Sequence, residues 1–382
     1  MRLPTGAMPT GTMATSAVEL NGESFFSYAF TLEFIVGSIT ATCGVVSLAS
    51  LAAFAWRVHR LFEFSEEISG TQECAEIVPV PLNQLGETIS RINAHLLDEQ
   101  ILEAGELLMR VQKTIRQHPN ATEAADAKQV LQKPLLGRLS EAELLRRYAE
   151  CTQAVRDLAV SEGWVRVLET ETSVTSTRKL ADGTAWLQST NRVHAGLSEL
   201  LATWKEGDLF VHWLPDCIDS KVLVQITPVE SLCWWRTRTK AGLELDASMH
   251  CYPCDAFPRH GFALMIGRPA PPEQWPAISW PELGRWRMRA PALAMSIKIE
   301  QVGREVQSCF VLGPMAAGLL RVPNFIVQWV LKNSLSLILE GQAKCAIDAR
   351  EHPDGHPLAE RIKQRADFYR DWLLPRLPKS AE

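Results

Sequence analysis

The chain has 382 residues, of which 46% are hydrophobic and 22% are charged, and its formal net charge is −5. This composition is sufficient for one good-sized globular domain and a smaller helical part. The negative net charge and the scattered basic residues argue against general binding to nucleic acid. The nine cysteines follow no framework of spacings, which is typical of reduced thiols in a cytosolic compartment.

The first predicted elements are a disordered tail over residues 1–33 and a membrane-spanning helix directly after it. From Phe34 to Trp56 the chain has no charged residue. A helix of this length reaches about 35 Å, enough to cross a hydrocarbon core of about 30 Å. Arg57 and Arg60 follow at once, so the positive-inside tendency places the rest of the chain in the cytosol. The sequence therefore predicts a single-pass membrane protein with a cytosolic C-terminal domain; a buried core helix or a signal peptide is the alternative.

A linker and a helical segment come next. Residues 57–84 are interpreted as the linker because Pro79 and Pro81 interrupt any regular pattern. Over residues 85–160, leucine, isoleucine and valine recur at three- and four-residue spacing, which predicts several amphipathic helices. Ser140 and Glu143 form a capping-box pattern at the start of the last of them. Such helices could also bind a partner protein.

After Gly163 the pattern changes to that of β-strands. Residues 174–180 and 184–193 are separated by Asp182 and Gly183, a sequence typical of a hairpin turn. A short helical stretch follows over residues 196–205, and apolar and polar residues then alternate in several further strands up to about residue 312. The pattern predicts an antiparallel sheet with one face in water.

The last long element is a helix that starts at Pro323, a favourable residue for a first helical turn. Every fourth residue from Asn324 to Asp348 is polar, and most of those between are apolar. Gln328 and Lys332 would lie near the middle of a membrane span, so the helix is expected to be covered by protein instead. The predicted fold class is therefore α+β, with a curved antiparallel sheet closed by a long C-terminal helix and preceded by the helical segment and the membrane helix.

This order of elements resembles the START (StAR-related lipid-transfer) domain family and its helix-grip fold. The resemblance covers residues 163–349, within a domain predicted at 163–374. The segment from Asp208 to Pro215 is similar to the acidic and aromatic segment of the family, and the segment from Val322 to Ile326 is similar to the opening of its closing helix. Other helix-grip proteins, including cyclases and hydroxylase subunits, are competing interpretations.

The resemblance implies a hydrophobic cavity between sheet and helix that holds one lipid or sterol, in a membrane-anchored lipid-binding or lipid-transfer protein. Movement of the terminal helix and neighbouring loops would open its mouth. Candidate lining residues are apolar residues of the strands and the terminal helix, with Arg236 included for the ligand's head group. They are Trp213, Val224, Trp234, Arg236, Phe262, Leu264, Met288, Met295, Ile297, Phe310, Ile326, Trp329, Val330 and Leu337. An ordinary core position is the alternative for each of them.

The sequence predicts no catalytic residue, cofactor or metal. Nucleophile elbows, phosphate-binding loops, dinucleotide fingerprints and HExxH patterns are absent. His250, Cys251, Cys254 and His260 are metal-ligand types close in sequence, but neighbouring strand residues point to opposite faces.

Two other functions stay open. A cyclase-type or hydrolase-type enzyme could use the same cavity, with His194, His212 or His250 as acid or base. An anchored scaffold could bind a protein through residues 85–160 instead.

Overall fold

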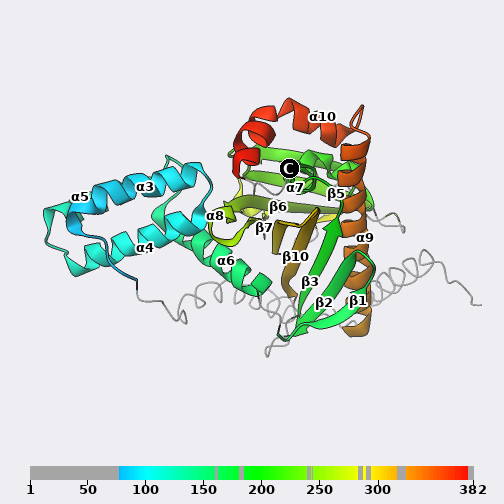
Figure 1. Ribbon diagram of the computed structural model, residues 1–382, viewed down its shortest axis with the longest axis horizontal. Helices are drawn as coiled ribbons and strands as arrows, with labels where there is room; N and C mark the ends of the chain where they lie inside the picture. The colour runs from blue at the N-terminus through cyan, green and yellow to red at the C-terminus, as the bar shows by residue number, and fades with distance from the viewer. Residues whose placement is uncertain are drawn as a thin grey trace, which may run out of the picture. The chain divides into compact units, whose positions relative to one another are not determined.

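The computed structural model describes residues 77–159, 162–179, 185–238, 242, 244–282, 287–289, 294–315 and 324–376. All of them belong to one compact unit, Val58–Glu382. Figure 1 shows the helices and strands of this unit with the labels used below.

A ten-stranded sheet forms the centre of the described residues, with strand order β1-β2-β3-β10-β9-β7-β6-β5-β4 and β8 paired to β6 (Figure 1). Every pairing is antiparallel except that of β6 with β8. The strands are β1 (Val165–Glu169), β2 (Ser173–Lys179), β3 (Ala185–Val193), β4 (Cys217–Gln225), β5 (Ser231–Arg238), β6 (Glu244–Asp255), β7 (Phe262–Pro269), β8 (Arg287–Arg289), β9 (Met295–Val302) and β10 (Glu305–Met315).

The predicted hairpin is confirmed, because β2 and β3 pair with Thr175 opposite Ser189. The turn between β9 and β10 contains Gly303 at φ 63°, a left-handed conformation that glycine adopts without steric cost. Helix α7 (Leu197–Lys205) and the short 3₁₀ helix η3 (Gly207–His212) join the first three strands to the rest of the sheet. Short helices α8 (Phe257–His260) and η4 (Pro272–Gln274) flank β7.

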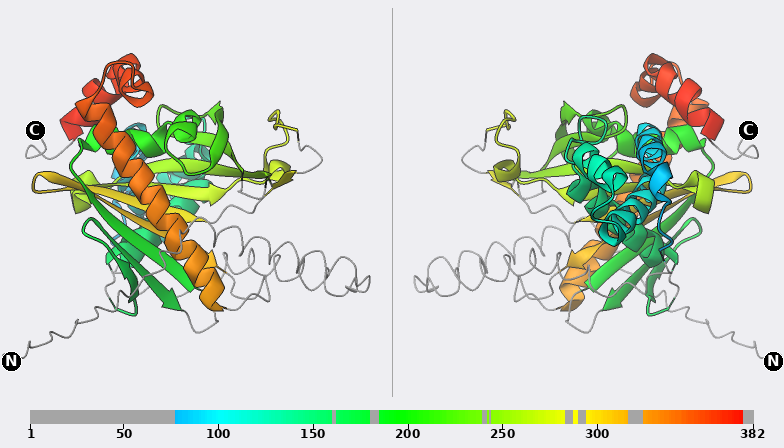
Figure 2. Two further views of the ribbon diagram at one scale, coloured as in Figure 1. Left: turned by 90° about the vertical axis from the view of Figure 1, so that its right-hand side faces the viewer. Right: turned by 90° about the vertical axis from the view of Figure 1, so that its left-hand side faces the viewer.

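Helix α9 (Asn324–Glu351) begins directly after the predicted Pro323 and runs diagonally across one face of the sheet (Figure 2). It contacts β2, β3 and α7. We call this side the α9 face. Its core comes from alternate residues of the strands together with α7 and α9, and includes Leu187, Met249, Cys251, Ile297, Phe310, Trp204 and Ala346.

The opposite side of the sheet, the α6 face, carries a segment of four helices, two of which contact its strands; the segment lies on the other side from α9 (Figure 2). The four helices are α3 (Leu85–Leu97), α4 (Ile101–Gln117), α5 (Thr122–Leu131) and α6 (Glu141–Ala159), preceded by the 3₁₀ turn η2 (Leu82–Gln84). Tyr252, Cys254, Phe262, Leu264 and Ile266 pack into the apolar core of these helices. The expectation of one face in water is therefore wrong for β6 and β7, since both of their faces are buried.

The start of α6 follows its predicted signal. The backbone N–H of Glu143 donates a 3.1 Å hydrogen bond to the Ser140 hydroxyl. The Glu143 side chain pairs with Arg146 and Arg147 instead of returning to Ser140, so only half of a capping box is formed.

After α9, a C-terminal segment folds back toward α7. It comprises α10 (Pro357–Gln364), the π-helical turn η5 (Asp367–Leu373) and the 3₁₀ turn η6 (Leu374–Arg376). The His356 side chain accepts a hydrogen bond from the Leu358 N–H at the start of α10. Phe368, Tyr369 and Leu373 are buried against the core of the α9 face.

The structure also corrects the predicted localisation. Across the ranges described above, no helix is long and apolar enough to cross a membrane. The longest of them, α9, contains Lys332, Glu340 and Lys344. The predicted span, with Phe34, Trp56, Arg57 and Arg60, lies outside the described residues. This finding contradicts the prediction of a single-pass membrane protein, which is withdrawn.

Candidate functional site

An apolar cavity of about 50 Å³ lies on the α9 face of the sheet. Residues of β6, β7, β9, α7, α8 and the C-terminal segment surround it. They are Leu201, Trp204, Lys205, Val229, Pro253, Cys254, Asp255, Phe257, Ala263, Leu264, Met265, Ile297, Ile299, Phe368, Trp372, Leu373 and Arg376. Ligand pockets are typically about 300–1,000 Å³, so this cavity is largely filled by side chains and must widen to take a lipid.

Trp204, which lines the cavity, belongs to a cluster of aromatic rings in the core of the α9 face. Trp204 stacks on Phe310 with ring centroids 5.3 Å apart and meets the edge of Trp213 at 5.2 Å. Trp213 in turn meets Phe210 edge-on at 5.4 Å. The predicted acidic and aromatic segment thus folds as η3 and places its aromatic rings against the end of α7. The indole N–H groups of Trp204 and Trp213 are buried and have no hydrogen-bond partner among the described residues.

Three residues with ionisable charged groups, Lys205, Asp255 and Arg376, are among those that line the cavity. The Lys205 ammonium is 2.6 Å from a Glu206 carboxylate oxygen and 4.6 Å from the centre of the Phe368 ring. Burial lowers the Lys205 pKa, although the Glu206 charge opposes this effect. One Asp255 oxygen accepts from the Phe257 N–H, and the other has no hydrogen-bond partner within the described ranges. Burial raises the Asp255 pKa.

The C-terminal segment is fastened by a buried ionic cluster around Glu206. The Glu206 carboxylate accepts hydrogen bonds from Arg361 at 2.7 Å and from the Tyr369 hydroxyl at 2.8 Å. Arg361 also donates two hydrogen bonds to Asp208, at 2.9 and 2.6 Å. Burial alone would raise the Glu206 pKa, but the charges and hydrogen bonds of Lys205 and Arg361 outweigh it and lower the pKa. Glu206 and Asp208 therefore stay ionised and hold the segment over the cavity.

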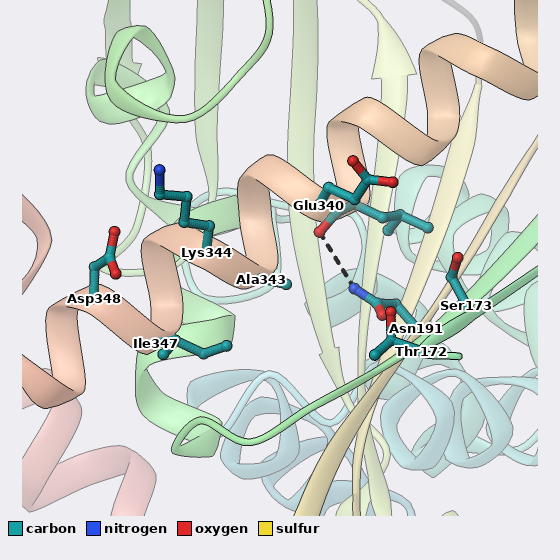
Figure 3. A pocket seen from close by; sticks show the side chains of 9 residues that line it. Thr172, Ser173, Asn191, Glu340, Ala343, Lys344, Ile347 and Asp348 are labelled. Atoms are coloured by element: carbon teal, nitrogen blue, oxygen red, sulfur yellow. Dashed lines mark hydrogen bonds between the residues drawn. The ribbon is translucent and has the colours of Figure 1, made fainter. Parts of the chain in front are cut away.

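A second hollow, a cleft of about 270 Å³, lies between α9 and the β2–β3 hairpin (Figure 3). Its walls are polar on the sheet side and mixed on the helix side. They are Thr172, Ser173, Asn191, Leu339, Glu340, Ala343, Lys344, Ile347 and Asp348. In Figure 3 the Asn191 amide reaches up to the α9 backbone, where it donates to the Leu339 carbonyl at 3.2 Å.

An ionic network lies on the α6 face of the sheet, and its residues do not line the apolar cavity. Glu230 accepts hydrogen bonds from Arg147 at 2.6 and 3.0 Å and is 2.8 Å from the His250 ring nitrogen. Arg147 lies on α6 and His250 on β6, so these contacts attach the helices to the sheet. Burial would raise the Glu230 pKa, but His250 and Arg147 outweigh it and bring the pKa to about 2.

The structure brings four of the predicted lining residues together on the α9 face. Trp213, Met295, Ile297 and Phe310 are all buried in its core. Of these, Ile297 lines the apolar cavity directly.

Other predicted lining residues lie elsewhere. Phe262 and Leu264 pack on the α6 face, although Leu264 also borders the cavity. Trp234 is buried next to Arg236, whose guanidinium lies 4.8 Å from its ring centre. Arg236 pairs with Asp246 at 2.8 Å.

Trp234 and Arg236 both point to the α6 side of the sheet. The neighbouring Cys233 approaches Gly207 on the α9 face, and adjacent strand residues point to opposite sides.

The structure does not place the remaining predicted lining residues together at one site. Val224 is half-buried on the edge strand β4, opposite Leu232, and Leu337 is 46% exposed. Met288 lies in β8 opposite Leu245. Four side chains fall outside the described residues, and they are those of Met288, Ile326, Trp329 and Val330.

Several cavity residues escaped the sequence interpretation, chiefly Leu201, Trp204, Phe368 and Trp372. Phe368 and Trp372 are four residues apart in the C-terminal segment and stack with centroids 5.2 Å apart. This aromatic spacing was a signal for a covering segment, but the sequence did not show which surface the segment covers.

The three histidines of the enzyme interpretation do not line the apolar cavity. His194 is exposed and lies 2.9 Å from Glu305, and His212 is exposed at the end of η3. His250 belongs to the network on the α6 face.

No protein-family model matches the chain, and no curated protein matches it. Similar solved structures include human StAR-related lipid transfer protein 5, with 15% identity and a TM-score of 0.44 over 52% of this chain and 94% of that chain. A StAR-related lipid transfer protein from Xanthomonas axonopodis has 14% identity and a TM-score of 0.40 over 48% of this chain and 98% of that chain. The Zhui aromatase/cyclase from Streptomyces sp. R1128 has 9% identity and a TM-score of 0.31 over 44% of this chain and 95% of that chain.

The fold of the described residues is START-like: three strands, α7 and η3, further strands and the long helix α9 follow one another in the order that the sequence resemblance implies. The resemblance implies six strands between η3 and α9, and the structure has seven, of which the short β8 lies off the main strand order. The TM-scores of these three structures are all below 0.5, so the function proposed below depends on the side chains of this chain.

Proposed function

We propose that the chain binds one lipid or sterol molecule on the α9 face of the sheet and carries it there in a water-excluded site. The observation that supports this most directly is the apolar cavity between sheet, α7 and the C-terminal segment. Burial of apolar ligand surface contributes about 25 cal/mol per Å², so such a site binds a lipid without any catalytic group.

Buried polar atoms without partners also support a ligand. Most buried polar groups in folded proteins are hydrogen-bonded, and each exception needs an explanation. On the α9 face the exceptions include the indole N–H of Trp204, which lines the cavity. The Asp255 oxygen that makes no hydrogen bond is not such an exception, because it lies 3.8 Å from the Arg376 Nε. A bound molecule with a polar group would give such atoms a partner.

Binding requires the cavity to widen, and the C-terminal segment is the element we expect to move. It supplies Phe368, Trp372 and Leu373 to the cavity wall. Side-chain contacts to Glu206 and Asp208 fasten it, whereas the strands beneath are joined by continuous ladders. Release of these ionic contacts, together with withdrawal of Phe368, Tyr369 and Leu373 from the core, would uncover the cavity without breaking a strand ladder.

The scaffold interpretation has less support, because the apolar sides of α3, α4 and α6 are already used in packing on the sheet. The test is native mass spectrometry of the full chain, followed by extraction and identification of any bound lipid. The proposal predicts one lipid or sterol per chain, either as purified or after incubation with mixed-lipid vesicles. A chain that remains without ligand after that incubation would overturn the proposal.

A further inference from the structure

The floor of the cleft beside α9 contains a buried amide with one unused oxygen. Asn191 is 2% exposed, and its Nδ2 donates to the Leu339 carbonyl. A carbonyl only accepts, so this contact fixes the orientation of the amide and directs Nδ2 toward α9. The Asn191 Oδ1 then has no hydrogen-bond partner among the described residues, although Asn191 lines the cleft (Figure 3).

A second unused polar atom lies beside it. Ser308 on β10 is directly opposite Asn191 on β3, so the two side chains share one face with Cβ atoms about 5 Å apart. Ser308 is 1% exposed, and its hydroxyl likewise lacks a partner in the described part of the chain. By contrast, the nearby hydroxyls of Thr175 and Ser189 satisfy each other at 2.7 Å.

Asn191, Ser308 and Ile299 form a row of neighbouring residues across three strands, between the polar cleft and the apolar cavity. Ser308 is opposite Ile299 on β9, and Ile299 lines the apolar cavity. Neighbouring strands are about 4.8 Å apart, so Asn191 and Ile299 are separated by roughly 10 Å across the sheet. One elongated molecule can therefore contact the amide with its polar end and cover Ile299 with its apolar body.

The chemistry of the row selects the kind of polar end. Asn191 Oδ1 needs a hydrogen-bond donor, and the Ser308 hydroxyl can either donate or accept. A free hydroxyl group satisfies both residues. An ether or ester oxygen has no hydrogen to donate, and neither has an ionised carboxylate.

We propose that the cleft between α9 and the β2–β3 hairpin receives a neutral hydroxyl group of the ligand, which donates to Asn191 Oδ1 and contacts Ser308. The ligand is then an apolar molecule with a free hydroxyl, such as a sterol or a long-chain alcohol. This inference rests on the proposed lipid binding, and it adds the ligand's chemical class and the residues that select it.

The test compares matched probes that differ only in this hydroxyl. Cholesterol and cholesteryl methyl ether form one pair, and 1-hexadecanol and its methyl ether form the other. Their affinities for the full chain are measured by displacement of a fluorescent apolar dye. In at least one pair we expect the alcohol to bind about tenfold more tightly than the ether, because the ether leaves a buried acceptor unpaired.

Substitutions at Asn191 and Ser308 test which of these two residues causes the preference for the alcohol. Asn191→Leu should reduce the alcohol-to-ether ratio to less than about threefold, with the ether affinity unchanged. Ser308→Ala removes only an unpaired hydroxyl, and because a serine hydroxyl donates equally to an alcohol or an ether oxygen, it should weaken the binding of both probes and leave their ratio unchanged. Asn191→Ser, which shortens the side chain but keeps it polar, should also reduce the ratio and decides the matter if Asn191→Leu does not fold. Ser189→Ala is the control, since its hydroxyl already has a partner, and it should leave the ratio unchanged.

Each outcome has one meaning. If both members of a pair bind equally well, the chain is a lipid binder and the hydroxyl assignment is overturned. The same holds if every folded Asn191 variant keeps the wild-type ratio, or if Ser308→Ala weakens the binding of neither probe. If no probe binds and native mass spectrometry finds no lipid, the proposed function itself fails.

Discussion

The Tyr369 hydroxyl donates a 2.8 Å hydrogen bond to the Glu206 carboxylate, and 163 residues separate the two in the sequence. Glu206 ends the α7 stretch, whereas Tyr369 belongs to the C-terminal segment. Their contact therefore connects the segment after the long helix with the residues that precede β4. Both side chains are almost fully buried, so the hydrogen bond forms in a region of low dielectric constant, where it is strong.

Tyr369→Phe tests how firmly this contact holds the segment. The substitution removes one hydrogen bond to a charged group, which should lower the free energy of unfolding by about 1.5–3 kcal/mol. Urea denaturation measures the change. Tyr148→Phe is the matched control, because the half-buried Tyr148 hydroxyl makes no side-chain hydrogen bond within the described ranges, and it should change stability by less than about 0.5 kcal/mol. Equal effects of the two variants would show that the Glu206 contact contributes nothing.

Acid should weaken the α6 face through Glu230. Its pKa is about 2 in the folded chain and about 4.3 when unfolded, so its ionised form stabilises the fold by about 3 kcal/mol at neutral pH. Because the folded pKa is the lower one, this contribution is complete above about pH 4.5 and is lost as the pH falls toward 2. Glu230→Gln should therefore lower stability at pH 7 and flatten its dependence on pH below 4.5.

Unfolding free energies at pH 7, 4.5 and 3 measure this effect. Glu171→Gln, at an exposed turn position, is the control that should keep the wild-type profile. If the unfolding free energy of Glu230→Gln falls between pH 4.5 and pH 3 as steeply as that of the wild type, Glu230 is not the source of the acid sensitivity.

The helices over residues 85–160 should be needed for a soluble sheet. A chain that starts at residue 163 lacks α3 to α6 and exposes Tyr252, Phe262, Leu264 and Ile266, a contiguous apolar patch of the kind that aggregates. We expect it to elute as aggregate in size-exclusion chromatography and to bind an apolar dye strongly. A chain that starts at residue 77 keeps the helices and should elute as a single folded species. A well-behaved chain from residue 163 would show that the helices are dispensable.

Filling the cavity should weaken ligand binding with little loss of fold. Ala263 lines the cavity beside Met265, and in Ala263→Leu the added carbons occupy space that the ligand needs. Exclusion of two ligand methylene groups, at about 0.8 kcal/mol each, lowers affinity roughly tenfold. The cost in stability should stay below about 3 kcal/mol. Titration with the lipid identified by mass spectrometry measures the affinity, and Ala125→Leu on the exposed side of α5 should leave it unaltered.

The sequence predicted those parts of the fold where one side of an element is polar. In β9, Met295, Ile297 and Ile299 alternate with polar residues, and all three lie on the α9 face. The start of α9 was equally clear, because Pro323 precedes a long run of regular polar spacing. In these places residue type alone was enough to assign each side chain to the core or to solvent, because the side that faces the core is apolar and the side that faces water is polar.

Prediction failed where both sides of a strand are buried. Cys233 and Trp234 are adjacent and both almost fully buried, so alternation could not show that Trp234 points away from the α9 face. The same ambiguity hid the helices packed on β6, in which Cys251 and Tyr252 face opposite cores. A strand buried on both faces reads as a continuous apolar run.

The polar part of the candidate site was beyond sequence interpretation for a different reason. Asn191 and Ser308 are on strands that become neighbours only in the folded sheet. Arg147 and Glu230, which fix the helices to the sheet, are 83 residues apart. Nothing in the local pattern of either residue indicates its partner, because such contacts depend on topology.

Arg376 in the C-terminal segment pairs with Asp98 at the end of α3, across 278 residues of sequence. The covering of the cavity therefore depends on a segment that follows every strand of the sheet in the sequence. While translation proceeds, the sheet can form with its apolar α9 face still open, and the enclosure is complete only after the C-terminal segment has emerged. During that interval a nascent chain is most exposed to aggregation and to chaperones, and it is also the time at which a first ligand can enter without any contact having to break.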